Sequence, residues 1–359
     1  MNQKERFLNT MRFKPVDRVP MWSSGYWNET LIRWYKEGLP KDINIEELFG
    51  CDRFTRIGTY FGFCPAFDVV VLEEDERTTT YINHEGIKMK ELSEKQETSM
   101  PQFLEFPVKN REDFEKVRYR LQLNEDFRFP KDWNDRCKTW KYRTIPLWLG
   151  GDRESGFFGP LRNMMGLEGL SFTFYDDPEL IEDMMDNRME LMLAILDKSL
   201  KDTELDMFMF WEDMACKNGP LLSPEMFKKF MVPRYRKITD FLRKKGVDII
   251  IVDSDGDISK LIPLWLTAGV NGMTPFEVQS GMDVVKLRKE YGNDLLMMGG
   301  IDKKVLAMTK RDIDEEIKRI YPIISKGGYI PIPDHSIPPD VPLENFLYYM
   351  TQLDKAVNC

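Results

Sequence analysis

The chain has 359 residues, 42% of them hydrophobic and 31% charged, so it can bury a large core and is neither disordered nor a small disulfide-bonded scaffold. Its formal net charge is −9, from 60 acidic and 51 basic residues, which argues against nucleic acids and anionic membranes as partners. No apolar run approaches the ~20 residues that span a bilayer, the first residues contain no signal-peptide core, and the five cysteines form no CxxC pair. We therefore expect a cytoplasmic protein.

Short apolar runs rich in β-forming residues alternate along the chain with longer amphipathic helical segments. The runs are residues 18–22, 53–59, 145–150, 206–211, 248–252, 272–275, 295–299 and 328–331. The helical segments between them include residues 177–200, 224–245, 282–291 and 310–325. This alternation is typical of a parallel sheet with crossover helices, and a count of eight predicts one α/β domain over residues 1–359, a (β/α)₈ barrel of the TIM type.

One segment interrupts the alternation. Residues 67–92 contain three extended pieces, separated by an acidic turn and by the turn Asn83-His-Glu-Gly86. A stretch of this length cannot bury a core of its own. We predict an antiparallel β-meander inserted after the second strand, within the barrel domain.

Acidic residues gather where the predicted strands end, at the face on which barrel enzymes carry their reacting groups. Glu212 follows the fourth strand, Asp253 and Asp255 the fifth, Asp302 the seventh and His335 the eighth. Carboxylates that converge on one pocket raise one another's pKa unless a cation lies among them. Asp253, Asp255 and His335 together offer two oxygen ligands and one nitrogen to a divalent metal ion such as Zn²⁺, with Glu212 as a fourth ligand or an acid–base group.

Structural roles remain open for the same residues. The sequence Asp253-Ser-Asp255-Gly256 is also an ordinary turn and helix-capping sequence. His335 lies in a proline-rich loop, where a histidine can simply bond to the backbone, and Glu212 has the alternative of pairing with Arg162. These alternatives are not decided by the spacing of the residues.

Aromatic residues also cluster near strand ends, which favours an apolar or aromatic substrate. We assign substrate binding to Trp22, Tyr26, Trp148 and Trp211, together with Asp302. The chain contains no GxxxxGK[ST], GxGxxG, HExxH or GxSxG motif, so nucleotide-dependent, zincin and serine-hydrolase chemistry are not indicated.

Several motifs resemble the uroporphyrinogen decarboxylase superfamily, in the right order and over nearly the whole chain. They are Glu5-Arg-Phe-Leu, Pro15-Val-Asp-Arg-Val-Pro20, Gly156-Phe-Phe-Gly-Pro160, Gly219-Pro-Leu-Leu-Ser-Pro-Glu225, Gly299-Gly-Ile-Asp302, Gly327-Gly-Tyr-Ile-Pro331 and Val341-Pro-Leu-Glu-Asn345. The resemblance implies a single (β/α)₈ barrel, in agreement with the strand count. It leaves the reaction open, because the superfamily contains decarboxylases and methyltransferases.

The decarboxylase branch is disfavoured by charge. Its members carry an arginine-rich segment near the N-terminus that holds the substrate's carboxylates, whereas the matching stretch here, Met21-Trp-Ser-Ser-Gly-Tyr-Trp-Asn28, has no arginine. A pocket ringed by Asp and Glu would also repel a porphyrinogen with many carboxylates. Because His335 matches a histidine of that branch, decarboxylation of uroporphyrinogen remains the alternative.

The other branch moves methyl groups to or from the cobalt of a corrinoid carried by a partner protein. In its thiol-methylating members, zinc is expected to bind a His-x-Cys-Gly motif and a later Cys. This chain resembles them in the positions of these motifs but has other residues there, Asp253-Ser-Asp255-Gly256 and His335. Oxygen and nitrogen ligands leave zinc a harder Lewis acid, which suits an oxygen leaving group. We predict a methyltransferase that demethylates a small O-methyl (methyl ether) substrate and passes the methyl group to a Co(I) corrinoid protein. A non-catalytic barrel that binds a corrinoid or aromatic ligand is the third possibility.

Overall fold

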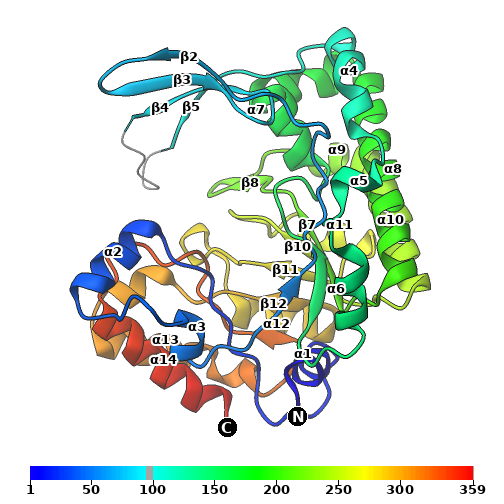
Figure 1. Ribbon diagram of the computed structural model, residues 1–359. Helices are drawn as coiled ribbons and strands as arrows, with labels where there is room; N and C mark the ends of the chain where they lie inside the picture. Colours follow the sequence, from blue (N-terminus) through cyan, green and yellow to red (C-terminus); the bar gives the residue numbers. More distant parts are fainter. Residues whose placement is uncertain (94–99, 359) are drawn as a thin grey trace.

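The computed structural model describes residues 1–93 and 100–358, and Figure 1 shows the order of its elements along the chain. The strands are β1 (Thr55–Arg56), β2 (Val70–Glu74), β3 (Thr78–Ile82), β4 (Lys88–Leu92), β5 (Gln102–Glu105), β6 (Leu147–Gly150), β7 (Met207–Trp211), β8 (Ala215–Cys216), β9 (Gly219–Pro220), β10 (Ile250–Asp253), β11 (Gly272–Thr274), β12 (Leu296–Met298) and β13 (Tyr329–Ile330). The α-helices are α1 (Gln3–Met11), α2 (Asn28–Lys36), α3 (Ile45–Leu48), α4 (Arg111–Arg118), α5 (Glu125–Arg128), α6 (Trp133–Trp140), α7 (Phe158–Asp176), α8 (Pro178–Asp202), α9 (Pro224–Met226), α10 (Val232–Lys244), α11 (Ile262–Thr267), α12 (Val284–Tyr291), α13 (Lys310–Ile324) and α14 (Leu343–Val357).

The main sheet is parallel and has seven strands in the order β1-β6-β7-β10-β11-β12-β13. Each strand overlaps one of the last seven predicted runs, and only β10 extends past its run, by one residue, so the prediction of a parallel α/β sheet with crossover helices is confirmed. The register places Asp253 of β10 opposite Trp211 of β7 on one side and Thr274 of β11 on the other. The carboxyl ends of these three strands therefore meet at one edge of the sheet.

Both faces of the main sheet are buried, which explains why its strands read as continuous apolar runs. Side chains alternate between the two faces along each strand. Inside the curve of the sheet, Met207, Met209, Ile249 and Ile251 pack in a small core that also contains residues of α1. Their neighbours in sequence pack outward in the large core beneath the helices, as Phe208, Phe210, Ile250 and Val252 do.

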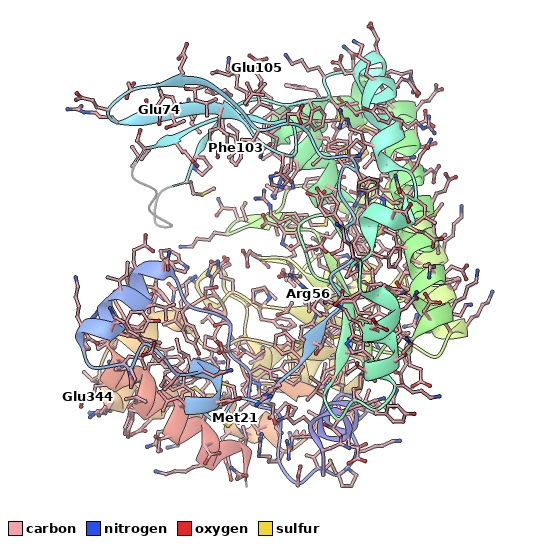
Figure 2. All side chains as sticks on the ribbon, viewed as in Figure 1. Met21, Arg56, Glu74, Phe103, Glu105 and Glu344 are labelled. Carbon is pink, nitrogen blue, oxygen red and sulfur yellow. The ribbon has the colours of Figure 1, made fainter. Side chains whose placement is uncertain are left out.

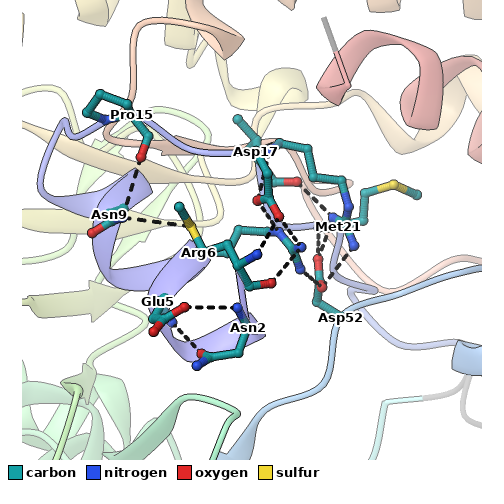
Figure 3. Close-up of polar contacts among 11 residues, drawn as sticks. Asn2, Glu5, Arg6, Asn9, Pro15, Asp17, Met21 and Asp52 are labelled. Carbon is teal, nitrogen blue, oxygen red and sulfur yellow. Dashed lines mark hydrogen bonds and ion pairs between the residues drawn. The ribbon is translucent and has the colours of Figure 1, made fainter.

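The first predicted strand, residues 18–22, is not a strand in the structure. Its backbone is instead satisfied by the side chain and backbone of Asp52 (Figure 3): Met21 N–H donates to Asp52 Oδ2 at 2.9 Å, and Asp52 N–H donates to Met21 O at 2.7 Å. Further along, Tyr26 forms a single parallel bridge with Ile337. This irregular segment is therefore hydrogen-bonded to Asp52, just before β1, and to Ile337, after β13. In the described part of the chain it fills the place between the two edges of the sheet without forming a regular eighth strand.

Four charges, of which Arg6, Arg18 and Asp52 are buried or half-buried and Asp17 is exposed, hold this N-terminal segment in place. Arg6 Nη1 and Arg18 Nη1 lie 2.8 and 2.6 Å from the two oxygens of Asp52, and Arg6 also pairs with Asp17 (Figure 3). The Asp52 side chain is 2% exposed, so these ion pairs are weakly screened by solvent. The position of Trp22 and the residues after it depends on this cluster.

The three extended pieces predicted in residues 67–92 are strands β2, β3 and β4, which pair antiparallel. A fourth strand, β5, joins them, and the four-stranded sheet projects as an arm from the side of the molecule opposite the two termini (Figure 1). Glu74, Phe103 and Glu105 mark this arm in Figure 2, far from Met21. At its base, Asn163 Nδ2 of α7 donates to Glu85 Oε1 at 3.4 Å, so the arm contacts the first part of the helix that follows β6.

Helix α8 begins where the capping residues of the sequence predict a helix start. Asp177 accepts the N–H of Leu180 at 2.9 Å at the start of α8, whose first residue is Pro178, as the preferred cap and first-turn residues predict. None of the helices in the described ranges combines the length and apolar character that crossing a membrane requires.

Candidate functional site

A cavity of about 420 Å³ opens at the carboxyl ends of the central strands. The last residues of four neighbouring strands line it: Trp211, Asp253, Thr274 and Met298. Six of the predicted site residues lie in its wall, namely Trp22, Trp148, Trp211, Asp253, Asp255 and His335. The structure therefore brings the proposed metal ligands and three of the four aromatic residues together.

Asp253, the last residue of β10, and Asp255, two residues later, have carboxylates that accept no hydrogen bond from the described part of the chain. Burial raises the pKa of Asp253 to about 8, with further increases from Asp255 and Asp213. Burial also raises the pKa of Asp255 to about 6, while His335 opposes the rise. A turn or cap would use these oxygens for backbone N–H groups, so the structure does not support that alternative.

His335 lies in the loop after β13, beside the N-terminal segment. Ser24 Oγ donates to the backbone oxygen of His335 at 2.8 Å, and Ser336 Oγ donates to the backbone oxygen of Ser24 at 2.9 Å. These two hydrogen bonds fix the backbone of the loop and do not involve the imidazole ring, which lines the cavity. Its Nδ1 atom is buried and has no hydrogen-bond partner.

These donors fit a divalent ion in their chemistry but are not arranged as a finished coordination shell. Within residues 1–93 and 100–358, no group of three or more His, Cys, Asp or Glu side chains is placed to hold a metal ion. Unpaired carboxylates and an unpartnered imidazole nitrogen are nevertheless the ligands that zinc and similar ions take. The metal remains a proposal, and it requires Asp253, Asp255 and His335 to converge.

Glu212 lies outside the cavity, contrary to the predicted role as ligand or acid–base group. Its carboxylate accepts the N–H groups of Phe157, Phe158 and Gly159 at 2.9, 2.6 and 3.2 Å, and a hydrogen bond from Tyr235 Oη. These are the unpaired donors at the N-terminus of α7. Burial raises the pKa of Glu212 to about 7 and the four hydrogen bonds oppose the rise. Glu212 thus joins β7 to α7, and the pairing with Arg162 is not formed either, because Arg162 binds the next residue.

That next residue, Asp213, lines the cavity and was not assigned a role from the sequence. Arg162 Nη2 donates to Asp213 Oδ2 at 2.8 Å, and Arg162 Nη1 to the Asp213 backbone oxygen at 2.6 Å. Asp213 has φ of 45°, a left-handed conformation that is costly for a residue other than glycine. The alternation of side chains along a strand could have identified it. Met209, Trp211 and Asp213 are two residues apart and all line the cavity, whereas Glu212 lies between them and points to the other face of the sheet.

Aromatic rings form one wall of the cavity. The ring of Trp148 lies 5.4 Å from that of Trp22 and 4.1 Å from that of Phe54, measured between centroids. Trp22 Nε1 is buried and has no hydrogen-bond partner. A substrate oxygen could accept this hydrogen bond.

Two predicted substrate-binding residues do not lie in the wall of the cavity. Tyr26 packs behind it against Trp34 and Phe346, with ring centroids 5.3 and 5.6 Å away. Asp302 accepts Lys304 N–H at 2.9 Å and Gln279 Nε2–H at 2.8 Å, so both of its oxygens support the loop after β12. Asp302 follows β12 but its side chain faces the neighbouring loop, whereas Tyr26 lies in the irregular N-terminal segment and packs against helices α2 and α14.

The parallel α/β half-barrel, with acidic and aromatic residues at its strand ends, defines the class of barrel enzymes that react at that face. Residues 158–355, more than half of the chain, match the uroporphyrinogen decarboxylase (URO-D) family model. The chain belongs to the uroporphyrinogen decarboxylase family. This is an enzyme superfamily, and membership does not choose the reaction.

The similar sequences are named uroporphyrinogen decarboxylases, whereas a similar solved structure is that of a methyltransferase. A uroporphyrinogen decarboxylase of Legionella pneumophila (strain Corby) is 28% identical over 128 residues, 35% of this chain and 36% of the relative, so the chain spans about a third of that protein's length. One of Vesicomyosocius okutanii is 24% identical over 253 residues, 67% of each chain. The structure of a methyltransferase from Methanosarcina mazei aligns over 99% of both chains with a TM-score of 0.65 and 16% identity, which shows a shared fold.

The position of Glu212 leads to a prediction about stability. Glu212→Gln keeps the size of the side chain but turns an amide NH₂ toward backbone N–H donors, so we expect the free energy of unfolding to fall by about 2–3 kcal/mol. Urea unfolding followed by circular dichroism measures this change. Glu168→Gln, at an exposed position of α7, the helix whose N-terminus Glu212 binds, is the matched control and should have little effect. Equal effects of the two substitutions would contradict the assigned role of Glu212.

Proposed function

We propose that this protein transfers a methyl group from a small O-methyl compound to a Co(I) corrinoid carried by a partner protein. The observation that carries the proposal is the charge of the cavity. Its wall contains Asp213, Asp253, Asp255 and Asp334, and no Lys or Arg is among the described residues that line it. Such a wall repels a substrate with many carboxylates and favours a neutral compound bound beside a cation.

Asp253, Asp255 and His335 would hold the cation, for which we propose Zn²⁺. When bound there, the ion would supply Lewis acidity toward the oxygen that leaves as the methyl–oxygen bond breaks. The electron pair of that bond remains on the oxygen, which takes up a proton and departs as an alcohol or phenol. The aromatic wall supports an aryl ether as the donor, because Trp22 and Trp148 offer ring faces and Trp22 Nε1–H can donate to its oxygen. Asp213, held by Arg162, is placed to orient a hydrogen-bond donor of the substrate.

The fold likeness to the methyltransferase of Methanosarcina mazei supports this choice, and the names of the sequence relatives support decarboxylation of uroporphyrinogen as the alternative. A non-catalytic barrel that binds a corrinoid or aromatic ligand is distinguished from both by its lack of turnover. Incubation of the protein with a reduced free corrinoid and an aryl methyl ether decides among them. We expect methylated cobalt and the phenol in equal amounts. Release of carbon dioxide from uroporphyrinogen without any methyl-cobalt would overturn the proposal.

The metal is tested by elemental analysis of protein purified with zinc present. We expect about one divalent ion per chain, and we expect His335→Ala to lose most of it, because the imidazole is one of three ligands. The chain has only two histidines, so His84→Ala, at an exposed turn of the arm, is the matched control. Wild-type protein free of divalent metal after zinc treatment would contradict the assignment.

A further inference from the structure

We propose that the cavity at the strand ends is the first of two adjoining chambers, and that Phe54 separates them and limits the length of the methyl donor. This inference rests on the proposed methyl transfer and adds a binding subsite to it. A second cavity, of about 610 Å³, lies beside the first, between the N-terminal segment and the residues just before β1. Ser23, Ser24 and Phe54 line both cavities, so these three residues form the partition between them.

Of the three, Phe54 has the only side chain large enough to close an opening. Its ring stacks on Trp148 with a centroid distance of 4.1 Å and an angle of 18° between planes, and meets the edge of Trp22 at 5.4 Å. Trp22 and Trp148 are buried, whereas Phe54 is 42% exposed. An aromatic pair contributes only modestly to stability, so a ring held by stacking on one side can rotate away when a ligand takes its place. Phe54 therefore fits the role of a movable partition.

The second chamber is lined by polar and charged side chains beside the apolar Cys51 and Ile145, and most of those charges are paired within the protein. Asp52 is bound by Arg6 and Arg18, and Arg53 pairs with Glu47. Among the other lining residues are the two serines, the Asn44 amide and Glu46. Asn44 Oδ1 accepts Glu47 N–H, which leaves its NH₂ group as a donor toward a ligand. A sugar has hydroxyl groups for the serines and Asn44 and C–H faces for Ile145 and Cys51, so it matches this mixed lining better than a charged tail does.

The substrate class that follows is a methyl ether whose aromatic ring lies against Trp22 and Trp148 and whose other end carries a hydroxylated extension. The first chamber alone holds the ring, and the extension passes Phe54 into the second. Ser23 and Ser24 remain as the frame of the opening, because Ser24 is tied by its side chain and backbone to the loop of His335.

The test compares the binding of two ligands, 4-methoxyphenol and 4-methoxyphenyl β-D-glucoside, by isothermal titration calorimetry without any corrinoid. Phe54→Ala should shift the affinity ratio of the two ligands by about tenfold toward the glucoside, because it removes the partition. Asn44→Ala, combined with Phe54→Ala, should reverse most of that gain and leave 4-methoxyphenol unaffected. Phe127→Ala, at a phenylalanine that is 72% exposed and lines neither cavity, is the control.

A Phe54→Ala variant that remains folded by circular dichroism and leaves the affinity ratio unchanged overturns the inference. Restoration of the wild-type ratio by Phe54→Tyr or Phe54→Leu would support it, since both refill the opening. The binding assay needs no methyl transfer. Failure of the proposed reaction would therefore appear as bound ligand without methyl-cobalt, and failure of the two-chamber inference as turnover of 4-methoxyphenol with no effect of Phe54→Ala on ligand choice.

Discussion

Asp253→Asn is expected to lower the rate of methyl transfer by about 10²-fold or more and, in metal-free protein, to raise the free energy of unfolding. The loss of rate follows from the removal of a charged ligand from the proposed metal site. The gain in stability follows from the structure alone. Asp253 lies at the end of β10 beside Asp255 and Asp213, and none of the described residues donates a hydrogen bond to its carboxylate. A neutral amide removes the repulsion among the three carboxylates.

The stability effect has a defined dependence on pH. An aspartate in an unfolded chain titrates near pH 4, whereas burial raises the pKa of Asp253 in the folded protein to about 8. The folded state therefore holds this proton more tightly, and the stability it confers is complete below about pH 4 and is lost as pH rises through 8. Asparagine has no such dependence. The advantage of the variant should grow between pH 5.5 and pH 8.5 and reach at least about 2 kcal/mol.

Urea unfolding in the presence of EDTA, at three pH values across this interval, measures the difference between variant and wild type. Asp257→Asn is the matched control in the same loop, because Asp257 Oδ1 accepts Ser259 N–H at 3.0 Å and its replacement should destabilise the protein slightly. Excess zinc should stabilise the wild type more than Asp253→Asn, since only the wild type keeps the full set of ligands. A destabilised variant at every pH would show that Asp253 supports the turn.

Strand positions were largely readable from the sequence because both faces of the main sheet are buried. Seven of the eight apolar runs contain a strand, and the alternation of side chains explains why Asp253 and Asp255 face the same cavity. The same alternation, applied to residues 209, 211 and 213, would have chosen Asp213 instead of Glu212. The helix that receives Glu212 begins more than fifty residues earlier, and the spacing of residues around β7 gives no sign of it.

Other features depend on contacts between distant parts of the chain. Residues 18–22 have the composition of a strand, yet Asp52 satisfies the Met21 N–H, and Tyr26 packs behind the cavity because Trp34 and Phe346 converge there. Asp302 follows a strand as predicted, but its oxygens are used by the neighbouring loop. The partner of Met21 lies 31 residues away along the chain and Phe346, a partner of Tyr26, lies 320 residues away, and local patterns carry no information about such contacts.

Asp52→Asn is expected to reduce the free energy of unfolding by about 3–5 kcal/mol, the largest effect on stability that we predict for a single substitution. Asp52 accepts hydrogen bonds from Arg6, from both terminal nitrogens of Arg18 and from the backbone of Met21, and its side chain is only 2% exposed (Figure 3). Removing the charge of one member of a buried cluster leaves the other charges without compensation, which costs more than the cluster contributes as a whole. Asparagine has a single Oδ1 acceptor, and its NH₂ group can only donate, so it cannot replace both of the oxygens that bind the two guanidinium groups.

Asp17→Asn is the matched control for Asp52→Asn. Both substitutions remove an ion pair with Arg6, but only Asp52 is buried, so the difference between them measures the effect of burial. Asp17 accepts two hydrogen bonds from Arg6, at 2.9 and 2.8 Å, but its side chain is 39% exposed, so its replacement should cost about 1 kcal/mol or less. Because Asp52 also holds the segment that carries Trp22, Asp52→Asn should speed hydrogen exchange at the amide of Met21 and lower affinity for an aromatic ligand of the cavity, whereas Asp17→Asn should do neither. Equal losses of stability from the two substitutions would show that solvent screens both ion pairs alike, and that the N-terminal segment is held by its backbone contacts instead.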